Sequence, residues 1–127
     1  MPRFVIQEHY ATSHNFDLRL ERDGVLVSWA VPKGMPEDAE KNRLAVRVED
    51  HDLPHLDVVD DTPVQGVPGA VKKSVWDRGT YEAEEFGEGM VIVRLRGGRL
   101  GGRYATFRNV GKNWFIHNTK SSGEAED

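Results

Sequence analysis

The chain has 127 residues, enough for one domain with a real core and too few for two ordinary domains. Its 21 acidic and 17 basic residues argue against a protein that coats nucleic acid non-specifically, but they allow a local basic site that binds phosphate. It contains no cysteine, which excludes disulfides and thiolate zinc sites, so a metal would need nitrogen or oxygen ligands, as manganese, magnesium or some zinc sites do.

Two runs near the N-terminus predict a β-hairpin, after a first β-rich run at residues 3–7. Residues 15–21 alternate polar and apolar side chains, as a half-buried strand does, and residues 25–31 form a second, apolar run. Asp23 and Gly24 lie between the two runs, and Asp-Gly at this place strongly indicates a two-residue hairpin loop. That loop predicts the cross-strand pairs Leu20–Val27, Arg19–Ser28, Leu18–Trp29, Asp17–Ala30 and Phe16–Val31.

The polar face of this hairpin has the composition of a pocket floor. The predicted pairing places Arg19 opposite Ser28 and Asp17 opposite Ala30. A purely structural sheet would more often pair such charges with other charges or with long side chains. We therefore expect open space above Asp17 and Arg19.

The middle of the chain predicts one more strand between two irregular segments. Residues 37–42 form a charged connection with room for at most one helical turn. Residues 43–49 alternate again, which predicts a half-buried strand. We expect its core face to carry Leu44, Val46 and Val48, and its other face Arg43, Ala45, Arg47 and Glu49. Residues 50–69 contain three prolines and many acids, and predict a long surface loop.

The last part of the chain adds short β-like runs and no helical pattern. Residues 70–76 and 80–83 predict two strands joined by a turn at 77–79. Three further runs follow, separated by glycine-rich or polar turns, at residues 90–95, 104–108 and 113–117.

We predict an all-β fold, a small closed β-barrel of about eight mainly antiparallel strands with little helix. Residues 1–120 would form this single domain, and residues 121–127 a disordered acidic tail. No apolar run is long enough to span a membrane, and the N-terminus lacks a signal-peptide pattern, which predicts a cytoplasmic protein.

The hairpin and the link at residues 8–13 that leads into it carry a candidate metal site. His9 and Asp17 could ligate one divalent cation, with Asn15 presenting an amide oxygen from the same face as Asp17. A surface ion pair between Asp17 and Arg19 is the plainer alternative. His14 points by parity to the core face, where a half-buried histidine at a strand end is expected.

Arg19, Lys33 and Arg43 are the candidates for binding an anion, although each alone is more often a solvated charge. His51 follows Glu49-Asp50, and an acid beside a histidine could tune the ring for proton transfer, while a turn role is equally compatible with the spacing. His55 could reach the same pocket.

Five segments give the chain a family resemblance: FVIQEHYATSHNFDLRLERDG, SWAVPKG, RLAVRVEDH, VWDRGTYE and WFIHNTK. In this order they resemble the 3'-phosphoesterase domain of bacterial DNA ligase D and its stand-alone relatives, over residues 3–120. The resemblance implies a β-barrel hydrolase that uses Mn2+, or another divalent metal such as Zn2+ or Co2+. It also implies action on 3' ends of DNA primer-templates in non-homologous end joining. Such an enzyme removes a 3'-terminal ribonucleoside and then hydrolyses the remaining 3'-phosphate to a 3'-hydroxyl. Implied partners are ligase D-type ligase or polymerase modules and end-binding repair proteins.

Carried over by motif, His9 and Asp17 match metal ligands, and Gln7 matches a supporting polar residue. The residues that match positions around the scissile phosphate are Arg19, Lys33, Arg43 and His51. Two positions depart from the family pattern. Asn15 stands where the family has its second metal-binding histidine, which predicts weaker metal binding and activity, with His14 displaced by one position. His55 stands where the family usually has a tyrosine.

Two other functions remain open on the sequence. A non-catalytic module that binds DNA ends would keep the anion-binding residues while its metal site decayed through Asn15. A small β-barrel oxygenase would hold iron with His9, Asp17 and His51, a ligand set that needs none of the neighbouring cations.

Overall fold

The structure is a computed structural model that describes residues 1–11, 13–36 and 42–119. The predicted tail at 121–127 and nearly all of the predicted connection at 37–42 lie outside the described residues. Within the described ranges, no helix has the length and apolar character needed to cross a bilayer.

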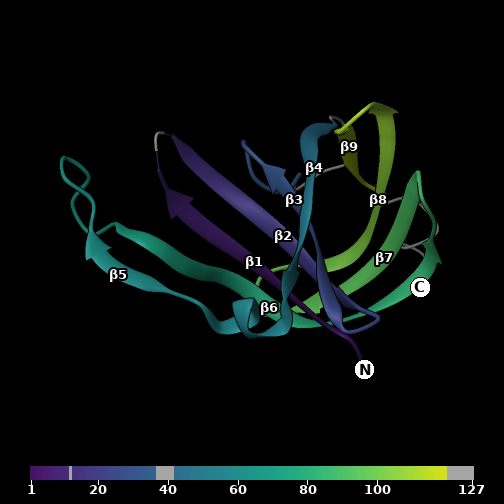
Figure 1. The fold of residues 1–127 in the computed structure, drawn as a ribbon, viewed down its shortest axis with the longest axis horizontal. Coiled ribbons are helices and arrows are strands. Elements are labelled where there is room, and N and C mark those ends of the chain that lie inside the picture. Colours follow the sequence, from purple (N-terminus) through teal and green to yellow (C-terminus); the bar gives the residue numbers. More distant parts are fainter. Residues whose placement is uncertain (12, 37–41, 120–127) are drawn as a thin grey trace.

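The described part of the chain consists of strands and one short 3-10 helix (Figure 1). In chain order they are β1 (Arg3–Tyr10), β2 (His14–Arg22), β3 (Val25–Val31), β4 (Arg43–Asp52), η1 (Leu53–Asp57), β5 (Asp60–Pro63), β6 (Val71–Phe86), β7 (Met90–Gly97), β8 (Gly101–Val110) and β9 (Asn113–Asn118). The strands form one antiparallel sheet in the order β1-β2-β3-β4-β9-β8-β7-β6-β5.

Pairing of β1 with β6 closes this sheet into an eight-stranded barrel, and β5 adds to the outer edge of β6. The 16 residues of β6 make this possible, because its first half pairs with β1 and its second half with β7. Figure 1 shows β6 running along the base of the barrel. The predicted all-β closed barrel is confirmed.

The β2–β3 hairpin has the predicted register, with Arg19 opposite Ser28 and Asp17 opposite Ala30. Asp23 and Gly24 form its loop with positive φ angles of 53° and 85°, which a glycine and an acidic residue tolerate best. The alternate apolar residues of both strands point into the barrel, where Leu18, Leu20 and Trp29 are almost fully buried.

The predicted faces of β4 are wrong. Ala45 is fully buried beside its partner Trp114, and Arg47 lies over the ring of Trp29, whereas Leu44 is 41% exposed. Arg43, Ala45 and Arg47 therefore face the barrel interior. The alternation of residues in β4 does not show which of its two faces is buried. The register of β4 with β3 and β9 decides this, and register is a non-local feature.

Two bulges change which side chains reach the outer face of the barrel. Between Leu26 and Ser28 of β3, β4 carries one extra residue, and His51 consequently lies opposite Leu26 on the outer face. In β6, Trp76 is the extra residue, because Ile6 pairs with Asp77 and Gln7 pairs with Val75.

The predicted turn at 77–79 is also wrong, because β6 runs through it. Asp77 is 5% exposed, and its carboxylate accepts hydrogen bonds from the backbone N–H groups of Gly98, Arg99 and Leu100 in the β7–β8 turn. Asp77-Arg78-Gly79 is therefore not a turn itself. Its aspartate instead holds the turn of the β7–β8 hairpin in place. The predicted loop at 50–69 contains the end of β4, η1 and β5.

Candidate active site

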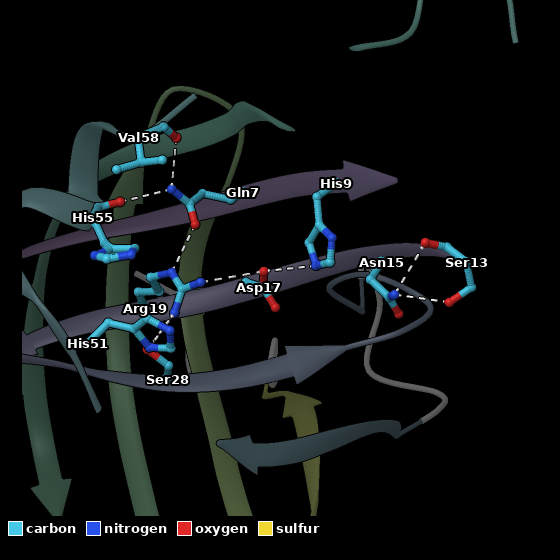
Figure 2. A network of polar contacts seen from close by, with 10 residues as sticks. All are labelled: Gln7, His9, Ser13, Asn15, Asp17, Arg19, Ser28, His51, His55 and Val58. Carbon is cyan, nitrogen blue, oxygen red and sulfur yellow. Dashed lines mark hydrogen bonds and ion pairs between the residues drawn. The ribbon is translucent and has the colours of Figure 1, made fainter. Parts of the chain in front are cut away.

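A row of polar side chains crosses the outer face of β1 and β2, opposite the barrel core (Figure 2). Direct cross-strand pairs share a face, and here Gln7 pairs with Asp17 while His9 pairs with Asn15. The apolar residues Val5 and Leu26, on the same outer face, are covered by η1 through Leu56. The polar row therefore begins where this cover ends.

Arg19 is the buried centre of the row, with 4% of its surface exposed. Its Nε donates to Gln7 Oε1 at 2.8 Å, and its Nη1 donates to Ser28 Oγ at 2.9 Å and to His51 Nδ1 at 3.0 Å. Its Nη2 lies 3.5 Å from Asp17 Oδ2. Burial lowers the pKa of the Arg19 guanidinium and the Asp17 carboxylate opposes that shift, so a fixed cation sits beside the carboxylate.

Gln7 links this cation to η1. It is fully buried, and while its Oε1 accepts from Arg19, its Nε2 donates to the carbonyls of His55 at 2.8 Å and Val58 at 3.1 Å. All of these bonds appear in Figure 2. The supporting role expected of Gln7 thus has a concrete form: it fixes both the guanidinium and the segment that carries His55.

His9 and Asp17 have the separation expected of two ligands of one cation. His9 Nε2 lies 3.0 Å from Asp17 Oδ2. Two ligands that each lie about 2.1 Å from a cation, at right angles to one another, are roughly 3 Å apart.

Asn15 can add an amide oxygen, because its Nδ2 donates to the carbonyl and hydroxyl oxygens of Ser13, which leaves Oδ1 available. The described residues contain no group of three His, Cys, Asp or Glu side chains placed to hold a metal. His9 and Asp17 supply only two ligands of these types, so the amide oxygen of Asn15 would have to be the third ligand of a divalent cation.

His14 does not replace Asn15. β2 stays in regular register from its pair with Tyr10 onward, so no bulge rotates His14 to the outer face. Its Nε2 lies 2.7 Å from Glu8 Oε2, and its ring stacks on Tyr10 at 4.2 Å between centroids. His14 lies on the core face of β2, as predicted, but its side chain is exposed, whereas a half-buried side chain was expected.

His51 enters the row from β4, and its two ring nitrogens differ. Nδ1 faces an Arg19 donor, so this nitrogen accepts and the proton resides on Nε2. Burial first, then the charges of Arg19 and His55, lower the pKa of His51, against a smaller opposing effect of Glu49. The ring of His55 lies 4.9 Å away, and its buried Nδ1 has no hydrogen-bond partner among the described residues. The structure thus brings both histidines to the arginine end of the row.

Lys33 and Arg43 do not join the row in the predicted way. Lys33 is exposed in the turn after β3, where Gly34 has a φ of 83° and packs against Phe16. Arg43 lies on the interior face of its strand, so the expectation that it shares a face with Asp17 is wrong. Its Nη1 instead donates to the backbone carbonyl of Lys33.

The alternative iron site is not formed. Arg19 contacts His51 through Nη1 and Asp17 through Nη2, so the guanidinium lies between these two side chains. An iron ion held by His9, Asp17 and His51 would have to displace the guanidinium of Arg19, which is buried and held by several hydrogen bonds.

Sequence reasoning missed one residue of the row, Lys73 of β6, which pairs directly with His9. The sequence gives no sign that Lys73 lies beside His9, because this pairing depends on barrel closure and on the bulge at Trp76.

The sequence matches one family model and several curated relatives. The family model for the DNA ligase D 3'-phosphoesterase domain matches residues 7–108. The Multifunctional non-homologous end joining protein LigD of Mycobacterium bovis is 49% identical over 122 residues, that of Mycolicibacterium smegmatis 46% over 134, and that of Pseudomonas aeruginosa 40% over 132. These matches cover 93%, 97% and 97% of this chain, and 16%, 18% and 16% of the relatives. The chain spans about one sixth of the length of the relatives that it matches.

Proposed function

We propose a function from one premise: this chain belongs to the DNA ligase D 3'-phosphoesterase domain family. The chain acts as a metal-dependent hydrolase on the 3' ends of DNA in non-homologous end joining. Its substrates are primer-templates that end in a ribonucleotide or a 3'-phosphate. It works in the cytoplasm beside ligase or polymerase modules of the kind named in its relatives, and beside end-binding proteins.

One observation supports the proposal most: a histidine and a carboxylate, spaced like two ligands of one cation, lie next to a buried guanidinium on an outer face. His9 and Asp17 are 3.0 Å apart, and Arg19, whose Nη2 lies 3.5 Å from Asp17, supplies a positive charge that burial and three hydrogen bonds hold in place. Phosphoryl transfer needs such preorganised positive charge around the phosphoryl oxygens far more than it needs a covalent intermediate.

The proposed chemistry has two hydrolytic steps. In the first, water adds to the phosphorus of the last phosphodiester, and the bond to the 5'-oxygen of the terminal ribonucleoside breaks. That oxygen takes a proton, and a 3'-phosphate remains on the primer. In the second, water adds to this phosphorus, the bond to the 3'-oxygen breaks, and the products are a 3'-hydroxyl and inorganic phosphate.

The residues divide this work as follows. His9, Asp17 and Asn15 hold the divalent cation, most simply Mn2+, which when bound supplies Lewis acidity at a phosphoryl oxygen. Arg19 and the exposed ammonium of Lys33 hold the other oxygens.

Arg43 is a positioning residue, because its guanidinium binds the Lys33 carbonyl and fixes the turn that carries this lysine. His51, with Nδ1 bonded to Arg19, offers its Nε2–H to the leaving oxygen or to the attacking water. His55 packs against that ring at 4.9 Å and restricts its orientation.

A second candidate, a module that binds DNA ends without catalysis, is favoured by Asn15 alone. An amide oxygen is a weaker ligand than an imidazole for Mn2+ or Zn2+. Under this alternative the protein binds a primer-template, does not turn it over with any divalent metal, and gains activity when Asn15→His is introduced.

The test uses a labelled primer-template that ends in one ribonucleotide, and a second one that ends in a 3'-phosphate, each with Mn2+. We expect both to be converted to 3'-hydroxyl ends. Asp17→Asn should lower the rate roughly a hundredfold or more. The matched control is Asp23→Asn in the exposed β2–β3 loop, which should act like the unmodified protein. No conversion of either substrate by folded protein would remove the enzyme proposal.

A further inference from the structure

Lys73 extends the polar row onto a third strand. In antiparallel strands, residues that pair directly point to the same face. His9 pairs with Asn15 of β2 on one side and with Lys73 of β6 on the other. Lys73, His9 and Asn15 therefore stand side by side on the outer face of the barrel.

The bulge at Trp76 is what turns Lys73 to this face. Without the extra residue, the register set by Ile6 and Asp77 would bring Ser74 opposite His9 and send Lys73 inward. The neighbouring Lys72 has the opposite parity and is exposed on the other side of the strand.

No ion pair of the Lys73 ammonium group is found among the described residues. The pKa of Asp60, its cross-strand neighbour on β5, is lowered first by hydrogen bonds from the Thr62 hydroxyl at 2.6 Å and backbone N–H at 3.0 Å, and to a smaller extent by the charges of Lys72 and Lys73. Lys73 itself is half-buried rather than fully solvated. A half-buried lysine without an ion pair in the described part of the chain is available for an external anion.

Lys73 and Arg19 lie on opposite sides of the His9–Asp17 pair. Along β1, Arg19 is opposite Val5 and Lys73 is opposite His9, a difference of four positions or about 13 Å. Adjacent strands are roughly 4.8 Å apart, so Lys73 is one strand away from the metal-ligand candidate His9. One phosphate bound near Asp17 would contact Arg19, and Lys73, on the other side of His9, is better placed for the next phosphate of the same strand.

We propose that Lys73 binds the DNA phosphodiester next to the phosphate that reacts, and so aligns the primer strand across β2, β1 and β6. This inference rests on the proposed function, because it assumes that the reacting phosphate occupies the His9–Asp17 end of the row. Lys73 is a substrate-binding residue that acts away from the bond that breaks, so its contribution belongs in KM and not in kcat.

The experiment compares Lys73→Gln with Lys72→Gln, two adjacent lysines that lose the same charge on opposite faces of one strand. Binding of a primer-template with a 3'-phosphate is measured by fluorescence anisotropy between about 50 and 200 mM salt, with steady-state turnover in Mn2+. For Lys73→Gln we expect a several-fold rise in KM with unchanged kcat. The slope of log affinity against log salt should fall by about one. Lys72→Gln should leave both KM and the slope unchanged, and Lys73→Arg should keep the slope of the unmodified protein.

A second substrate separates phosphate binding from a structural effect. A nucleoside 3'-phosphate has no neighbouring phosphodiester, so Lys73→Gln should process it like the unmodified protein. Equal slopes and KM values for Lys73→Gln and the unmodified protein on the primer-template overturn the Lys73 proposal alone, as does an equal loss on both substrates. Failure of the unmodified protein to act on either substrate overturns the proposed function, and the Lys73 proposal with it.

Discussion

Replacement of Asp77 by Asn should destabilise the barrel from the face of β6 opposite to the polar row. The carboxylate is 5% exposed and accepts four backbone hydrogen bonds. Oδ1 accepts from Arg78 at 2.9 Å, Gly98 at 2.8 Å and Arg99 at 3.1 Å, and Oδ2 accepts from Leu100 at 2.8 Å. These bonds fasten the β7–β8 turn to the middle of β6.

The size of the effect follows from the number and kind of bonds lost. In Asp77→Asn, the amide oxygen can keep the three bonds of Oδ1, but the amide NH2 replaces Oδ2 and opposes the buried Leu100 N–H. A hydrogen bond to a charged group contributes about 1.5–3 kcal/mol, and a buried donor without a partner costs about 1–3 kcal/mol. Because these two estimates partly describe the same loss, we expect roughly 2–4 kcal/mol, a large part of the 5–15 kcal/mol typical of a domain.

Urea unfolding followed by tryptophan fluorescence measures this change in the free energy of unfolding. The matched control is Asp61→Asn, because Asp61 is exposed on β5 and should change stability by less than about 0.5 kcal/mol. A value for Asp77→Asn equal to that of the control would refute the argument that this carboxylate anchors the turn.

Three further outcomes are expected. Asn15→His should tighten Mn2+ binding in a calorimetric titration while His14→Gln leaves it unchanged, and the reverse order would show that His14 is the ligand. The pKa of His51 lies below its usual 6.5, so the stability it contributes is complete above that pH and is lost as the pH falls through the lowered pKa. An NMR titration of the ring with a midpoint at or above 6.5 would contradict this. Gly97→Ala should lower the free energy of unfolding by about 1–3 kcal/mol, because the added Cβ would meet the Asp77 carboxylate and the Phe4 ring. Gly89→Ala is the control, because its Cβ would enter open space. Equal melting temperatures for the two variants would contradict this prediction.

The sequence predicted the parts of the site that depend on local patterns. The β2–β3 register followed from one Asp-Gly loop, so the facing of Asp17 and Arg19 followed with it. The pairing of His9 with Asn15 was not predicted, because the first β-rich run was expected to end at residue 7 and instead continues to Tyr10.

Features that depend on distant strands could not be predicted in the same way. Arg43 was placed on the wrong face because β4 alternates regularly on both sides, and only its contacts with β3 and β9 select the buried one. The turn predicted at residue 77 failed because an acidic residue followed by Arg-Gly resembles a loop, while its partners lie more than 20 residues further along the chain. The position of Lys73 beside His9 could not be predicted either, because it depends on barrel closure and on the bulge at Trp76.

The two bulges have an evolutionary consequence. Each adds a single residue to one strand, and each thereby decides whether His51 or Lys73 reaches the outer surface. Loss of one codon near Trp76 would exchange Lys73 for Ser74 beside His9 without altering the hairpin that carries Asp17 and Arg19. A relative without this extra residue would therefore lose the proposed Lys73 contact, while the hairpin that carries Asp17 and Arg19 keeps its register.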